Sequence, residues 1–72
     1  MDKYDNFDGI LIKKRNSFFQ TNITYLYLQS DEKRIKVKFG RAGAASLDIG
    51  RSLIIGHIGK KVINIHDDYD TE

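Results

Sequence analysis

The stretch Thr24–Phe39, TYLYLQSDEKRIKVKF, contains two alternating segments on either side of a polar turn. Alternation of apolar and polar residues is typical of strands that bury one face only. A four-residue loop at 30–33 sets the register of the resulting hairpin. One face then pairs Leu28 with Ile35, Leu26 with Val37 and Thr24 with Phe39, and the other pairs Tyr27 with Lys36 and Tyr25 with Lys38. We therefore predict one core face and one face of tyrosines and lysines.

The same period of two continues on both sides of this hairpin. It predicts strands at 9–15, 21–29, 34–39, 51–57 and 61–65. GRAGAASLDIG, from Gly40, predicts a short helical turn between the third and fourth strands. Asp48-Ile49-Gly50 reads as a tight turn, and GHIGKK as a hairpin in which Gly56 and Gly59 can adopt positive φ.

These elements predict an all-β fold, namely a small five-stranded antiparallel barrel of the SH3-like or OB-like kind. Seventy-two residues are enough for a single domain at 1–72. We expect an ordered core at about 7–66 between acidic, flexible ends.

Charge is distributed unevenly along the chain. Residues 9–66 contain eleven basic and three acidic residues, a net charge of +8, whereas residues 1–8 carry −2 and residues 67–72 carry −4. The basic body favours an acidic partner. The acidic ends either lie on that body and compete with phosphate or only increase solubility.

Aromatic rings next to ammonium groups are what a single-stranded nucleic-acid surface requires, since bases stack on rings while phosphates pair with cations. The hypothesis is therefore a nucleic-acid-binding face. Lys14 belongs to the wider basic footprint of the first strand. The residues of the hypothesis are Tyr25, Tyr27, Lys36, Lys38, Arg34, Lys13, Arg15, Lys60 and Lys61.

Two other interpretations stay open. Tyrosine and lysine also suit the solvated side of an antiparallel sheet, where lysines discourage edge-to-edge aggregation. In addition, Phe18 and Phe19 follow each other where the first strand turns into the second. In an extended backbone at most one of them is core, so the other would contact a partner protein or a second copy, unless a bulge buries both.

The sequence contains no convincing catalytic or metal-binding motif. Gly59-Lys60 lacks the earlier glycine and the following hydroxyl of a phosphate loop, and His66-Asp67-Asp68 in an acidic tail makes a poor metal site. We therefore expect a protein that is not an enzyme, with no metal, cofactor or small-molecule substrate. With no cysteine, no apolar run long enough for a bilayer and no leader sequence, we also expect a cytoplasmic protein without a membrane partner.

FDGILIKKRNSFF, KVKFGRAG, LDIGRSL and IGHIGKKVINI together resemble an uncharacterised family of small bacterial and prophage β-barrel proteins. The resemblance covers about residues 7–65 and consists of turn signals. It implies a small SH3-like or related barrel and brings no activity or site residue with it.

Overall fold

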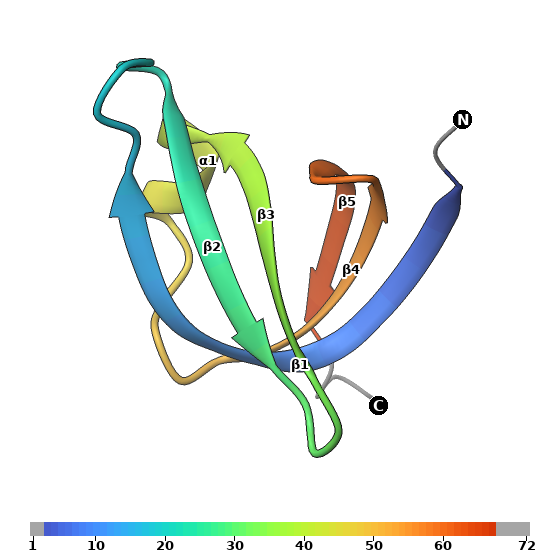
Figure 1. The fold of residues 1–72 in the computed structure, drawn as a ribbon. Helices are drawn as coiled ribbons and strands as arrows, with labels where there is room; N and C mark the ends of the chain where they lie inside the picture. Colours follow the sequence, from blue (N-terminus) through green and yellow to red (C-terminus); the bar gives the residue numbers. More distant parts are fainter. Residues whose placement is uncertain (1–2, 68–72) are drawn as a thin grey trace.

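The computed structural model describes residues 3–67 of the chain, which form five strands and one short helix (Figure 1). The elements, in chain order, are β1 (Tyr4–Asn16), β2 (Ile23–Gln29), β3 (Arg34–Gly40), α1 (Arg41–Ala45), β4 (Ser52–Ile58) and β5 (Lys61–Asp67). The protein is therefore all-β with one helical turn between β3 and β4, as the sequence predicts.

The five strands belong to one sheet that closes into a ring in the order β1-β2-β3-β5-β4. All neighbours run antiparallel except β3 and β5, which run parallel and pair Lys38 with Lys61. The expectation of an entirely antiparallel barrel is thus not confirmed, because the sheet is mixed. The exception follows from closing a ring with an odd number of strands, because five strands cannot alternate in direction at every neighbouring pair.

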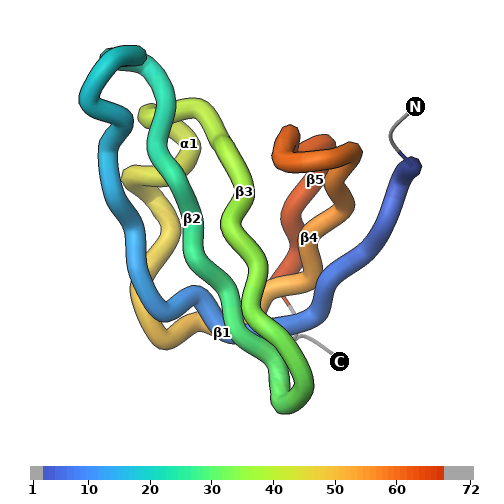
Figure 2. Tube along the Cα trace, in the orientation of Figure 1, coloured from blue at the N-terminus to red at the C-terminus, as the bar shows by residue number. Residues whose placement is uncertain are grey.

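β1 is much longer than the predicted 9–15 because it serves both halves of the ring. Its first half, from Tyr4 to Ile10, pairs with β4, and its second half, from Ile10 to Asn16, pairs with β2. A bulge at Ile12 interrupts the second pairing. Bulges bend and twist a strand, and the trace of β1 curves from one half of the ring to the other (Figure 2).

The register of the central hairpin is confirmed at every predicted pair, with Gln29 opposite Arg34 at the loop. Its inner side chains belong to a core in the middle of the ring. The buried apolar residues are Phe7, Leu11, Leu26, Leu28, Val37, Ala44, Leu53, Ile55 and Val62. Ile35, Phe39, Leu47 and Ile65 pack against this core and are only partly buried.

The predicted turns are confirmed at Gly50 and Gly59, whose φ angles are 97° and 59°. Gly56 differs from the prediction, because it lies inside β4 and is not among the glycines with positive φ. Its lack of a side chain serves packing instead. A Cβ at this position would collide with the Tyr4 hydroxyl and come within 2.8 Å of Asn64 Oδ1.

Phe18 and Phe19 lie in the loop between β1 and β2, and their exposed fractions are 89% and 88%. Neither ring enters the core, and no bulge buries the pair. The alternation rule fails here because residues 17–22 are not part of a strand. The acidic residues 68–72 lie outside the described part of the chain. Within that part, no helix is long and apolar enough to span a membrane.

Candidate nucleic-acid interface

The outer surface of β1, β2 and β3 carries two rows in which a tyrosine lies between two cations. In the first row, Tyr27 pairs with Lys13 on β1 and with Lys36 on β3. In the second, Tyr25 pairs with Arg15 on β1 and with Lys38 on β3. We call these residues the basic aromatic face: Lys13, Arg15, Tyr25, Tyr27, Lys36 and Lys38.

The cations lie close to the two half-buried rings. Lys13 Nζ is 5.5 Å from the centroid of Tyr27, while Arg15 Cζ and Lys36 Nζ are 5.8 Å and 5.1 Å from the centroid of Tyr25. These distances fall within the range of cation–π attraction, about 6 Å. The contacts hold the side chains of three strands together on one surface.

Within residues 3–67, no salt bridge joins the cations of this surface to a carboxylate. The salt bridges of that part of the chain join Arg51 to Asp48 at 4.0 Å and to Asp67 at 2.9 Å. On β3 and β5, two exposed lysines, Lys38 and Lys61, are direct neighbours. Like charges at facing positions destabilise a sheet, so a bound anion would relieve this repulsion.

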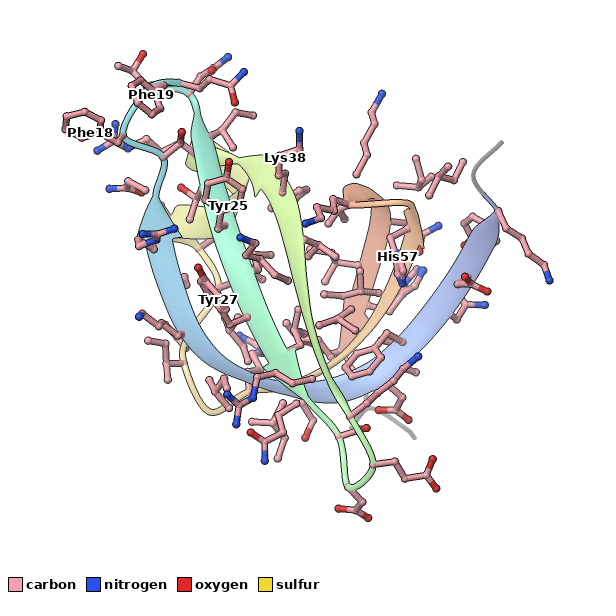
Figure 3. All side chains as sticks on the ribbon, viewed as in Figure 1. Phe18, Phe19, Tyr25, Tyr27, Lys38 and His57 are labelled. Atoms are coloured by element: carbon pink, nitrogen blue, oxygen red, sulfur yellow. The ribbon has the colours of Figure 1, made fainter. Side chains whose placement is uncertain are left out.

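The face continues at both ends with residues of the same kinds. Arg34 follows on β3 next to the hairpin loop, and Lys60 lies in the β4–β5 turn, where its carbonyl accepts a 2.6 Å hydrogen bond from Lys38 N–H. Phe18 and Phe19 lie beyond Tyr25 at the tip of the β1–β2 loop (Figure 3). Their rings contact each other edge to face at 5.1 Å.

Lys14 does not belong to the basic footprint, contrary to the expectation from its position between Lys13 and Arg15. It points toward the helix, and its ammonium donates to the carbonyls of Ala44 at 3.1 Å and Leu47 at 2.6 Å. Strict alternation from the buried Leu11 would have sent Lys13 and Arg15 inward. The bulge at Ile12 reverses the alternation, so these two residues face outward and Lys14 inward.

The structure therefore brings together the six residues of the basic aromatic face, which the sequence proposed for a nucleic-acid face, and places Lys14 elsewhere. It also places the phenylalanines of the alternative protein-interaction site at the end of that same surface. Sequence reasoning missed this proximity. The sequence did contain a signal for it, namely the short connection between β1 and β2. When a short loop joins two paired strands, the loop lies beside the first residues of the second strand.

The two histidines lie on β4 and β5, outside the basic aromatic face. His57 lies on β4, away from the tyrosines (Figure 3), and its Nδ1 contacts the Gly59 carbonyl at 2.8 Å. No group of three or more histidine, cysteine or acidic side chains in residues 3–67 has the arrangement of a metal site.

Comparison of the chain with protein-family models, with curated proteins and with solved structures finds no match. The resemblance to small bacterial and prophage barrels stays an expectation from the sequence. The functional argument therefore rests on the geometry of the basic aromatic face.

Proposed function

We propose that the protein is a non-enzymatic module that binds single-stranded nucleic acid on the basic aromatic face. The observation that carries the proposal is the pair of rows in which each tyrosine is flanked by cations from both neighbouring strands. Rings supply stacking surfaces and the flanking cations supply phosphate contacts on either side of them. A sheet face that only contacts solvent does not require each tyrosine to lie between two cations.

Stacking of a base on a tyrosine ring is more favourable than the cation–π contacts that the ring now makes. An exposed cation–π contact contributes about 0.5–1 kcal/mol, whereas a base stacked on an aromatic side chain contributes about 1–3 kcal/mol. A base can therefore displace Lys36 from the Tyr25 ring. The displaced ammonium stays next to the bound strand, where it can pair with a phosphate.

The spacing of the tyrosines favours an unpaired strand over a duplex. Tyr25 and Tyr27 are two residues apart on β2, so they are separated by about 6.8 Å along the strand. The rise per nucleotide within one strand of B-DNA is about 3.4 Å. Bases at this rise stack directly on one another, so two bases can each stack on a tyrosine ring only where the strand is unpaired and unstacked.

We place the fold with small barrels of the OB-like kind, in preference to the SH3-like kind. OB folds are partly open five-stranded barrels that bind oligonucleotides on strands two and three and on the loops between strands one and two and between four and five. Here Tyr25 and Lys36 lie on β2 and β3, Phe18 on the first of those loops and Lys60 on the second. The absence of cysteine agrees with a reducing compartment such as the cytoplasm.

The test is fluorescence anisotropy with a labelled, mixed-sequence single-stranded oligonucleotide at several salt concentrations. Tyr25→Ala and Tyr27→Ala are each expected to lower the affinity about 5- to 150-fold, the equivalent of one lost stacking contact. Lys38→Ala is expected to reduce the slope of log affinity against log salt by about 0.7.

Tyr4→Ala is the matched control, because Tyr4 is also exposed but pairs with Ile58 of β4 in the other half of the ring. It should leave the affinity unchanged. Binding that ignores salt, or that survives the loss of both Tyr25 and Tyr27, would refute the proposal.

The second candidate function is contact with a partner protein or a second copy through Phe18 and Phe19. It is favoured by the nearly complete exposure of two adjacent aromatic rings, which is unusual unless the rings meet a partner. Phe18→Ser and Phe19→Ser separate the candidates. A loss of self-association without a loss of oligonucleotide affinity would support the protein-contact function.

A further inference from the structure

The ring is held together weakly between β3 and β5. Within the described residues these strands are paired only where Lys38 faces Lys61, next to the hydrogen bond from Lys38 N–H to the Lys60 carbonyl. Every other pair of neighbouring strands is matched over at least six positions. We call the stretch of β3 from Arg34 to Val37, which precedes this contact, the open edge.

Within residues 3–67, backbone hydrogen-bonding groups of the open edge have no strand partner. In an antiparallel pair, every second residue directs its N–H and C=O toward the neighbouring strand. The hydrogen bonds from Ser30 N–H to the Lys33 carbonyl and from Arg41 N–H to the Asn22 carbonyl set this alternation for β2 and β3. By the same alternation, Arg34 and Lys36 direct their N–H and C=O groups away from β2.

The inner side of the ring is also incompletely covered near this edge. The four apolar residues that pack on the core without being buried are Ile35, Phe39, Leu47 and Ile65. They come from β3, from β5 and from the segment that connects α1 to β4. A hollow of about 360 Å³ is lined by Phe39 of β3 and Ile65 of β5 together with residues of α1 and of the segment that connects α1 to β4, among them Leu47.

The outer side of the edge is strongly basic. Arg34, Lys36 and Lys38 alternate along β3 with the inward-facing Ile35 and Val37. Basic side chains discourage another basic strand from pairing with this edge. They attract a strand that carries carboxylates at the facing positions.

We propose that the open edge of β3 binds an extended segment of a partner protein in which acidic and apolar residues alternate. The segment adds a strand to β3, as in β-strand addition. Its backbone pairs with the N–H and C=O groups of Arg34 and Lys36. Its apolar side chains cover Ile35 and Ile65, and its carboxylates lie beside the basic row of β3.

The test uses a synthetic peptide of alternating glutamate and valine, blocked at both ends and as long as β3, titrated into the ¹⁵N-labelled full chain. We expect the amide signals of Lys36 and Ile65 to shift with the peptide. We also expect hydrogen exchange of the Lys36 amide to slow at least tenfold, because this amide gains a partner. The Lys38 amide, already bonded to Lys60, should change little in exchange rate.

The control peptide has the same sequence with N-methyl groups on the amides of one edge. It keeps every side chain and loses the backbone donors of that edge. Two such peptides are compared, one methylated on each edge. We expect one of them to bind at least tenfold more weakly than the unmethylated peptide. Equal affinity of all three peptides would show that only charge is recognised and would overturn the proposal.

Two variants of one residue separate backbone pairing from charge. Lys36→Ala removes the ammonium and keeps the N–H, whereas Lys36→Pro removes both. Because this N–H points away from β2, proline removes no hydrogen bond of the β2–β3 ladder. We expect a few-fold weaker peptide binding for Lys36→Ala and a further tenfold loss for Lys36→Pro; equal affinities would contradict strand addition.

The acidic residues 68–72 of the chain itself are the competing occupant. Replacing Asp68, Asp70 and Glu72 by their amides tests them. If these changes alone shift the Lys36 and Ile65 signals of the free protein, the chain occupies its own edge and the partner proposal fails. The proposal does not depend on the proposed function, because the readout is a backbone amide of β3 and contains no nucleic acid.

Discussion

At the scale of single residues, neighbouring lysines on β1 have opposite roles. Lys13 points outward to the Tyr27 ring, and Lys14 points inward to two carbonyls at the end of the helical segment. Adjacent residues of a strand face opposite sides, and the bulge at Ile12 decides that Lys13 is the one that faces outward. Replacing each of these two lysines in turn therefore separates an effect on ligand binding from an effect on the stability of the fold.

Lys14→Met is expected to lower the free energy of unfolding by about 1–3 kcal/mol. The substitution removes hydrogen bonds from a charged donor and leaves the partly buried carbonyls of Ala44 and Leu47 without that donor. Urea denaturation measures the change. Lys13→Met is the matched variant and should stay within about 0.5 kcal/mol of the parent while it weakens oligonucleotide binding. An unstable Lys13→Met protein would contradict the orientation of both residues.

At the scale of strands, the side chain of Tyr4 on β1 can lie over Gly56 of β4 because Gly56 has no side chain. The Tyr4 hydroxyl lies where a Cβ of Gly56 would be, and it accepts a 3.2 Å hydrogen bond from Asn64 Nδ2 of β5. A tyrosine on β1 thereby crosses β4 and reaches β5. This contact helps to fix the first half of β1 on the ring.

Gly56→Ala is expected to destabilise the protein by about 1–3 kcal/mol, since the new methyl group forces Tyr4 and Asn64 to move. Gly40→Ala is the control, because no atom lies within 4 Å of a Cβ at that position. Thermal unfolding of the two variants and of the double variant Gly56→Ala with Tyr4→Ala measures the effect. Recovery of stability in the double variant is expected, and a Gly56→Ala protein as stable as Gly40→Ala would refute the close approach.

At the scale of the whole molecule, basic side chains far outnumber acidic ones in the body of the chain. Residues 9–66 carry a net charge of +8, and the salt bridges within residues 3–67 involve only Arg51 among the cations. Repulsion between like charges destabilises a compact state. The same excess charge is what the proposed function and the open edge of β3 use to attract acidic partners.

Sodium chloride is therefore expected to stabilise the free protein. Raising the ionic strength from 0.01 M to 0.15 M shortens the Debye length from about 30 Å to about 8 Å, which screens the repulsion among the lysines and arginines. The urea midpoint at the two concentrations measures the effect, and potassium chloride controls for the identity of the cation. A midpoint that falls with added salt would mean that attractive ion pairs outweigh the repulsion.

The sequence by itself determined the local structure of this protein. Alternation in Thr24–Phe39 is strong enough to predict the register of the hairpin, because a shift by one residue would bury lysines. The same argument predicts the tyrosine–lysine pairs, whereas the alanines after Gly40 predict the short helix and the glycines predict the turns at Gly50 and Gly59. These features depend on neighbours in sequence, whose periodicity is visible directly.

Tertiary structure alone decided how distant segments meet. The strand order made β3 and β5 parallel neighbours and left the edge around Lys36 open. The bulge at Ile12 turned Lys13 and Arg15 toward the tyrosines, and packing against β4 put Tyr4 over Gly56. No local pattern encodes such choices, because they depend on closing one curved sheet around a single core. The candidate interface thus combines a hairpin predictable from the sequence with the neighbours that the ring brought beside it.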